Sequence, residues 1–126
     1  MTGVADFFER YGRAFEAYDA DAITEFFLTP CLFVRGGTTE ASATPEEVAA
    51  SVRALLDLHR AWDVQTAAPS EVTVLEEGDH HAIARVGWML GRTNSRVAWS
   101  FATTYTLVAG PDDWRIASAI THDAPF

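Results

Sequence analysis

The chain has 126 residues, of which 48% are hydrophobic and 12% aromatic, and this composition supports one substantial core and excludes intrinsic disorder. Its nine basic residues, all arginine, stand against 18 acidic ones, and the net charge of −9 disfavours nucleic acid and anionic membranes as partners. The absence of lysine excludes Schiff-base chemistry, and the single Cys31 excludes an internal disulfide. We expect residues 1–126 to form one domain.

The sequence shows no targeting segment and no membrane span. Its first residues lack the basic segment and long apolar run of a signal peptide. No stretch is apolar over the roughly 20 residues that a membrane-spanning helix needs. We therefore expect a cytoplasmic protein.

The first predicted element is an amphipathic helix with an unusually aromatic face. Its apolar positions recur at helical spacing: Val4, Phe7, Phe8, Tyr11, Phe15 and Tyr18. Asp19 is a typical N-cap for a short second helix, which we expect to end at Thr29-Pro30. Residues 31–35 then form a short strand that Gly36-Gly37 interrupts.

The third predicted helix has a strong start. Thr44 is the cap, Pro45 occupies the first helical position and Glu47 completes a capping box. We expect Trp62 to end it. One stripe of this helix carries its apolar residues and a histidine: Val48, Val52, Leu55, Leu56 and His59.

After Val64 the hydrophobic period changes from 3.6 to 2, which predicts strands. We expect strands over 64–68, 71–76, 81–92, 97–108 and 114–122, separated by turns rich in Gly, Pro, Asn and Asp. Helices followed by a meander of strands predict an α+β domain with the helices packed on one face of an antiparallel sheet.

The last two hairpins allow a prediction of register. A two-residue turn at Asn94-Ser95 would place Trp88 opposite Phe101. A four-residue loop over 110–113 would place Phe101 opposite His122. Both registers put bulky side chains on one face of the sheet, so we expect Trp88, Phe101 and His122 to form a row there.

Small residues occupy the opposite face of the same strands. They are Ala98, Ser100, Ala102, Thr104, Ala117 and Ala119, with Arg85 and Met89 beside them. Alternation leaves this flat surface outside the core. We expect a homodimer through it, with a total buried area of at least about 1,200 Å².

The order of these elements, with the segments P-C-L-F-V, T-P-E-E and T-Y-T-L-V followed by D-D-W-R-I, resembles the nuclear transport factor two-like superfamily. Within it the chain is similar to the SnoaL-like and ketosteroid-isomerase-like proteins. The resemblance implies a cystatin-like α+β roll. In such a roll a cone-shaped, curved antiparallel sheet wraps around a pocket that three N-terminal helices close, commonly in a homodimer. It does not imply one activity, because the superfamily contains isomerases, dehydratases, polyketide cyclases and non-catalytic members.

The chain departs from these relatives at two places. Many SnoaL-like proteins carry a histidine where this chain has Ser118. Isomerase-like proteins place a carboxylate base near the end of the first strand, where this chain has no acid before Glu40. Tyr11 matches the general placement of a tyrosine acid on the first helix.

Two histidines are the candidate acid and base groups. His122 shares the bulky face of the last strand and His59 the apolar stripe of the third helix, so either could exchange protons inside a pocket. Tyr11 or Tyr105 could donate to a developing oxyanion. Alternatively, His122 is a polar residue on a fraying terminal strand and His59 a satisfied core histidine.

Aromatic side chains, with two polar residues near the C-terminus, are the candidate ligand contacts. The set comprises Phe15, Phe33, Trp62, Trp88, Trp99, Phe101, Ser118 and Asp123. Four tryptophans in a chain of this size can line an apolar ligand site or simply fill the core. Arg35 could hold an acidic ligand group at the pocket mouth.

No metal or cofactor site is expected. His80 and His81 are adjacent on a predicted strand, point to opposite faces and cannot chelate one ion. The sequence contains no cysteine cluster, phosphate-binding loop or dinucleotide-binding fingerprint.

Three functions remain open from the sequence. The first is a cofactor-free isomerase, dehydratase or cyclase acting on a small apolar carbonyl compound by general acid–base catalysis. The second is a non-catalytic module that binds a similar hydrophobic ligand, and the third is a dimeric scaffold. Two titratable side chains that converge inside the pocket would favour the enzyme over the binding module.

Overall fold

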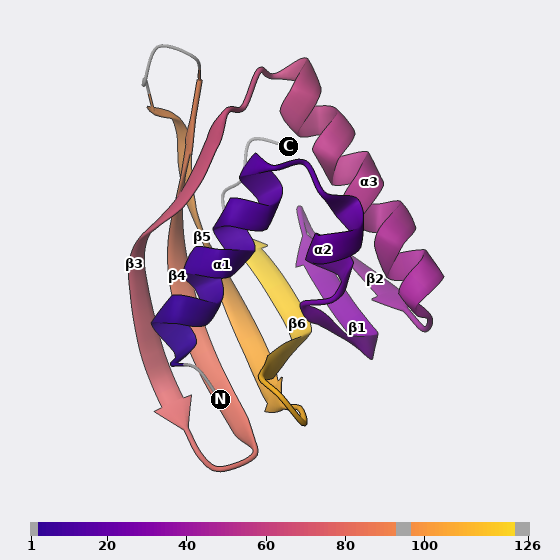
Figure 1. Ribbon diagram of the computed structural model, residues 1–126, viewed down its shortest axis with the longest axis vertical. Helices are drawn as coiled ribbons and strands as arrows, with labels where there is room; N and C mark the ends of the chain where they lie inside the picture. Colours follow the sequence, from indigo (N-terminus) through magenta and orange to yellow (C-terminus); the bar gives the residue numbers. More distant parts are fainter. Residues whose placement is uncertain (1–2, 93–96, 123–126) are drawn as a thin grey trace.

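The computed structural model describes residues 3–92 and 97–122, which form a six-stranded curved sheet with three helices against its concave face (Figure 1). The elements are α1 (Val4–Glu16), α2 (Ala20–Thr24), β1 (Phe27–Arg35), β2 (Thr38–Ser42), α3 (Pro45–Ala61), β3 (Thr66–Glu77), β4 (His81–Gly91), β5 (Val97–Ala109) and β6 (Trp114–His122). The strand order is β2-β1-β6-β5-β4-β3. This architecture confirms the predicted α+β class. Within the sheet, β1 and β6 pair in parallel and the other neighbours are antiparallel.

The helix caps form as the sequence predicts. At the start of α3 the backbone N–H of Glu47 donates to Thr44 Oγ1 (3.2 Å), and the N–H of Ala43 donates to Glu47 Oε2 (3.0 Å). At the start of α2 the N–H of Ala22 donates to Asp19 Oδ1 (3.1 Å). These bonds satisfy backbone donors that a helix leaves unpaired at its N-terminus.

The strands differ from the prediction at three places. Strand β1 starts at Phe27 and continues through the cis peptide Thr29-Pro30, whereas this proline was expected to end a helix. Residues Thr38–Ser42 form a strand that was not predicted. Strand β3 is continuous through Pro69, with a register shift beside it. An edge strand tolerates proline because one side of its backbone needs no partner.

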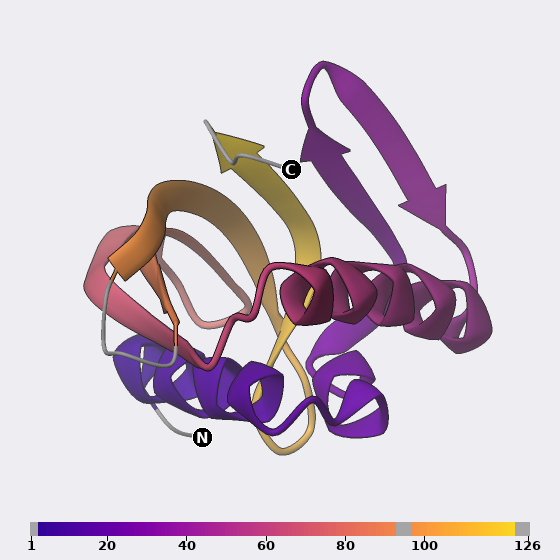
Figure 2. The same ribbon diagram turned by 90° about the horizontal axis from the view of Figure 1, so that it is seen from above.

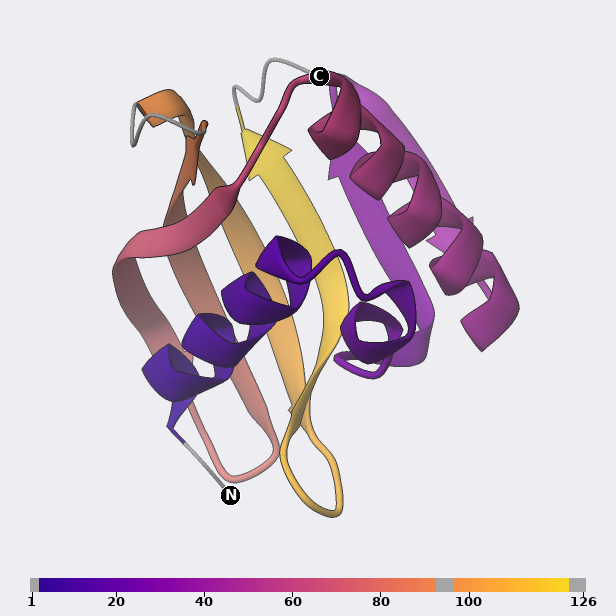
Figure 3. The same ribbon diagram turned by 45° about the horizontal axis from the view of Figure 1, so that its top comes forward.

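The helices cover one face of the sheet at two separate places (Figures 2 and 3). α1 lies against the β3 side, while α3 runs along the β1–β2 hairpin and contacts α2. The curvature of β3, β4 and β5 brings their ends toward α3. No helix of the described chain covers the convex face.

The main core lies between α1 and the sheet and is largely aromatic. Phe8 is fully buried, with its ring centroid 4.5 Å from that of Tyr105 and 6.4 Å from that of Trp88. Tyr11 continues this cluster toward the space under α3. The aromatic stripe predicted for the first helix therefore packs on β4 and β5.

The predicted register is correct between β4 and β5 and wrong between β5 and β6. Trp88 pairs with Phe101, as expected. The four-residue loop over 110–113 also forms, but Ala102, and not Phe101, pairs with His122. The cause is a β-bulge at Ala117, which adds one residue to β6 between its pairings with Thr106 and Leu107. The expected turn at residues 94–95 lies outside the described residues.

The bulge reverses the faces of the second half of β6. Trp114 and Ile116, before the bulge, are buried on the concave side. After it, Ala119 and Thr121 face the concave side, and His122 is exposed on the convex side. The expected row of Trp88, Phe101 and His122 is therefore wrong, because an inserted residue moves every following side chain to the other face.

Candidate functional site

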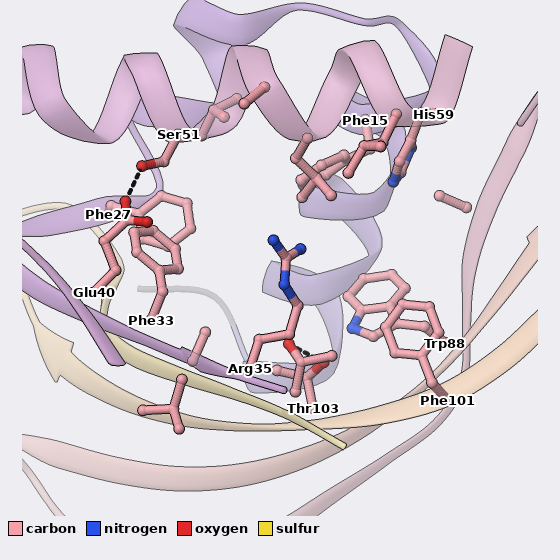
Figure 4. Close-up of a pocket in the computed structure, with 18 of the residues that line it drawn as sticks. Phe15, Phe27, Phe33, Arg35, Glu40, Ser51, His59, Trp88, Phe101 and Thr103 are labelled. Atoms are coloured by element: carbon pink, nitrogen blue, oxygen red, sulfur yellow. Dashed lines mark hydrogen bonds between the residues drawn. The ribbon is translucent and has the colours of Figure 1, made fainter. Parts of the chain in front are cut away.

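A cavity of about 440 Å³ lies between α3 and the concave face of the sheet (Figure 4). Residues from α1, α3 and all six strands line it. Most of the lining is apolar, and a few polar groups lie at separate positions on the wall. This composition is typical of small-molecule sites.

Aromatic rings form two walls of the cavity. Phe33 from β1 lies beside Phe27, with ring centroids 5.3 Å apart. Trp88 and Phe101, which pair across β4 and β5, form the opposite wall, and Phe15 closes the end beside α1. Phe15, Phe33, Trp88 and Phe101 are thus placed at the cavity, where the sequence predicted ligand contacts.

Two buried tyrosines and a tryptophan provide hydrogen-bonding groups at the cavity wall. The indole N–H of Trp88 donates to the hydroxyl of Tyr105 (2.9 Å). Burial raises the pKa of Tyr105 above its usual value, although side-chain hydrogen bonding with Trp88 and Thr103 opposes this shift. Burial likewise raises the pKa of Tyr11, whose ring centroid is 6.2 Å from that of Tyr105. Both phenols are therefore protonated at neutral pH and can donate a hydrogen bond.

His59 of α3 also lines the cavity. Its side chain is 4% exposed and its ring centroid is 5.5 Å from that of Phe15. Burial lowers the pKa of His59 to about 4, so the imidazole is neutral at pH 7. A neutral imidazole can donate or accept a hydrogen bond, but one with so low a pKa is a weak base.

Two charged residues of the β1–β2 hairpin complete the polar lining. Glu40 of β2 accepts a hydrogen bond from the hydroxyl of Ser51 on α3. Arg35, the last residue of β1, extends its guanidinium into the cavity (Figure 4). Glu40 was missed because β2 was not predicted, and Ser51 because it lies outside the apolar stripe of the predicted third helix. The Gly36-Gly37 turn after a short strand was the available indication of a hairpin.

Two predicted ligand contacts lie away from the cavity lining. Trp62 follows α3 and packs against Trp99 at the start of β5, with ring centroids 4.2 Å apart. Arg92 donates from Nε to the carbonyl of Trp62 (3.0 Å), and its guanidinium lies 4.9 Å from the ring centroid of Trp99. These rings join the end of α3 to the sheet.

The candidate polar residues of the last strand lie on the convex face. The hydroxyls of Ser118 and Thr106 share a hydrogen bond (2.6 Å), and His122 Nε2 is 3.5 Å from Thr104 Oγ1. The bulge at Ala117 is the reason that neither reaches the cavity. Asp123 lies outside the described residues.

The described ranges, 3–92 and 97–122, also bear on metal binding and membrane insertion. No three or more His, Cys, Asp or Glu side chains gather there as a metal site would require. His80 and His81, at the start of β4, have ring centroids 6.3 Å apart. None of the described helices is both long enough and apolar enough to span a bilayer.

A curved sheet with helices over its concave face and a cavity beneath them defines a cystatin-like α+β protein. The family model described as NTF2-like protein (DUF6841) matches residues 2–124, and the chain belongs to this family. The resemblance to the nuclear transport factor two-like superfamily is therefore confirmed. No curated protein matches the sequence.

Solved structures share this fold at low sequence identity. An NTF2-like protein with a cystatin-like fold from Novosphingobium aromaticivorans is 24% identical over 94% of this chain and 77% of that chain, with a TM-score of 0.70. A candidate dehydratase of the NTF2-like family from Streptomyces avermitilis is 16% identical over 94% and 91%, with a TM-score of 0.71. A candidate ketosteroid isomerase from Shewanella frigidimarina is 13% identical over 93% and 92%, with a TM-score of 0.69. At these identities the likeness shows the fold alone.

Proposed function

We propose that the protein binds a small, mainly apolar carbonyl compound in the cavity under α3. The observation that carries this proposal is the cavity of about 440 Å³, which is walled by aromatic rings on two sides and has few polar groups. Its size falls within the range of about 300–1,000 Å³ that is usual for ligand sites. Phe33 and Phe101 are only half-buried, so a ligand would cover apolar surface that now faces the cavity.

The hydrogen-bond donors of the cavity suit a carbonyl group. Tyr105 accepts a hydrogen bond from Trp88 and keeps its own proton at neutral pH, so its phenol can donate to a ligand oxygen. Tyr11 lies beside it and is also protonated at neutral pH. A carbonyl oxygen at these phenols would receive hydrogen bonds while the rest of the ligand packs on the aromatic walls.

Binding without catalysis is the function that the geometry supports best. His122, one candidate base, lies on the convex face. His59, the other, is a weak base because burial lowers its pKa to about 4. The carboxylate of Glu40 accepts a hydrogen bond from the hydroxyl of Ser51 and turns toward α3.

A cofactor-free isomerase or lyase is the second candidate, and the paired phenols favour it. Tyr11 and Tyr105 could together stabilise an enolate oxyanion, with His59 as the base. Exchange of the methyl protons of 2-acetonaphthone in D₂O, followed by NMR, separates the two functions. A rate above that of buffer, lost in Tyr105→Phe, supports the enzyme, and a rate equal to that of buffer supports the binding module.

The binding proposal is tested by titrating the protein with 2-acetonaphthone in a calorimeter. We expect saturable binding that Phe33→Ala weakens about fivefold, because about 1 kcal/mol of apolar burial is lost. Leu32→Ala is the matched control, since Leu32 is the neighbouring residue of β1, is 36% exposed and does not line the cavity. No saturable binding, or equal losses in the two variants, would contradict the proposal.

A further inference from the structure

We propose that Arg35 makes the cavity selective for carboxylic acids, so that the ligand carries an anionic group in addition to its apolar body. This inference rests on the proposed binding function and specifies the class of compound. It begins from the position of Arg35 on β1. Cys31, Phe33 and Arg35 alternate toward the concave side of this strand, and the last two line the cavity.

The guanidinium of Arg35 points into the cavity (Figure 4). Phe33 lies on one side of it in this view, and Trp88 and Phe101 lie on the other. Arg35 therefore lines the same cavity as both aromatic walls. A ligand with its rings on either wall would bring a substituent within reach of Arg35.

The guanidinium of Arg35 makes no ion pair and no hydrogen bond with any other described residue, while the backbone carbonyl of Arg35 accepts a hydrogen bond from the hydroxyl of Thr38. Arg35 pairs with Thr38 of β2, and Glu40 lies two residues after Thr38. Its carboxylate is held by Ser51 and turns away from the guanidinium (Figure 4). The positive charge of Arg35 at the cavity lining is thus not neutralised within the described chain.

The chemistry of arginine selects the partner. A guanidinium presents a planar fork of N–H donors that matches a carboxylate with two parallel hydrogen bonds. Neutral groups such as amides and ketones offer a single acceptor oxygen and no opposite charge. An aryl or alkyl acid therefore fits both the aromatic walls and Arg35.

The net charge of −9 acts against this selectivity, but only at long range. Interactions between exposed charges are screened beyond about 8 Å at physiological ionic strength. The contact between Arg35 and a carboxylate forms at hydrogen-bond distance, well inside this screening length. The local interaction therefore decides which ligand is preferred once it has entered the cavity.

The test compares 2-naphthoate with 2-naphthamide, which have the same aromatic body and nearly the same shape. We expect the wild-type protein to bind the acid about tenfold more tightly by calorimetry at neutral pH. This is the lower end of what charged hydrogen bonds contribute, because Arg35 is exposed to solvent. Arg35→Gln should bind both probes equally. Arg53→Gln, the same change on the exposed side of α3 and outside the cavity, should retain the preference.

Each result decides between the two proposals. Equal affinity of the wild-type protein for acid and amide overturns the role of Arg35 and leaves the binding function standing. No binding of either probe or of 2-acetonaphthone overturns both. A preference for the acid that survives in Arg35→Gln also overturns the role of Arg35. The wild-type comparison does not depend on whether that variant folds.

Discussion

At the scale of single residues, the two candidate histidines have opposite surroundings. His59 is 4% exposed at the cavity, whereas His122 is exposed on the convex face. In the sequence, His59 shares the apolar stripe of a predicted helix and His122 the bulky face of a predicted strand. The difference matters chemically because burial lowers the pKa of His59 to about 4, which keeps its imidazole neutral at pH 7.

Burial of His59 predicts a loss of stability in mild acid. The unfolded chain takes up a proton near the ordinary histidine pKa of 6.5, whereas the folded protein does so only near pH 4. The folded state therefore binds fewer protons between these values, and its stability falls as the pH falls. We expect the free energy of unfolding to decrease by about 2 kcal/mol between pH 7 and pH 5 from this group.

Urea unfolding at several pH values measures this decrease. His59→Gln removes the titrating group from a similar volume and should flatten the profile between pH 7 and pH 5. His122→Gln is the control and should leave the profile unchanged, since its side chain is exposed. A wild-type profile that is already flat in this range would contradict the burial of a neutral His59.

At the scale of secondary-structure elements, α1 approaches β3 closely at Gly12. A Cβ atom at this position would lie 2.6 Å from the carbonyl oxygen of Ala67 and 3.2 Å from the Trp88 ring. Only glycine, which has no Cβ atom, therefore allows α1 to lie this close to β3. The same contact positions Trp88, which forms one wall of the cavity.

This contact predicts that Gly12→Ala destabilises the protein. Alanine favours a helix by about 1 kcal/mol over glycine. Displacing a backbone carbonyl in a packed core costs about 1–3 kcal/mol, and this cost should dominate. Urea unfolding should show a lower midpoint for Gly12→Ala. Gly78→Ala is the matched control, because its nearest atom is at an ordinary contact distance of 3.8 Å, and a higher midpoint for Gly12→Ala would contradict the close approach.

The bulge in β6 is the element that shapes the cavity. With unbroken alternation after Ile116, Ile120 and His122 would project into the concave side. The bulge at Ala117 replaces them with the smaller Ala119 and Thr121. The inserted residue therefore leaves space for a ligand where bulky side chains were expected.

At the scale of the whole molecule, the convex face of the sheet is the surface that a homodimer would use. We propose this dimer because no described helix covers the face and Met89, an apolar residue on it, is 37% exposed. Its other members include Arg85, Ser100 and Thr104. Ala119, expected there from the sequence, faces the cavity instead.

Sedimentation at micromolar concentration tests the dimer. We expect Met89→Arg to give monomers, because it would place a charge at the centre of an interface of at least about 1,200 Å² in total. Ala61→Arg, at the exposed end of α3, should remain dimeric. A monomeric wild-type protein would contradict the proposal.

Local features of the chain could be predicted from the sequence because their causes lie within a few residues. The apolar stripe of α1, the cap at Thr44 and the loop over 110–113 all formed as expected. The pairing of Trp88 with Phe101 also followed from alternation. Together with the order of elements, these features were sufficient for the fold class and for the aromatic walls of the cavity.

The position of the polar groups was decided only by the tertiary structure. Around the bulge in β6, Ala117 and Ser118 are small and fit either face of a sheet, so the local sequence does not mark the inserted residue. Contacts with β5 and the space under α3 determine instead that Ala119 and Thr121 face inward. Arg35 likewise faces the cavity because β1 pairs with two strands that are distant from each other in sequence. The direction of side chains after a bulge depends on such long-range pairing, so it cannot be predicted from the local hydrophobic period.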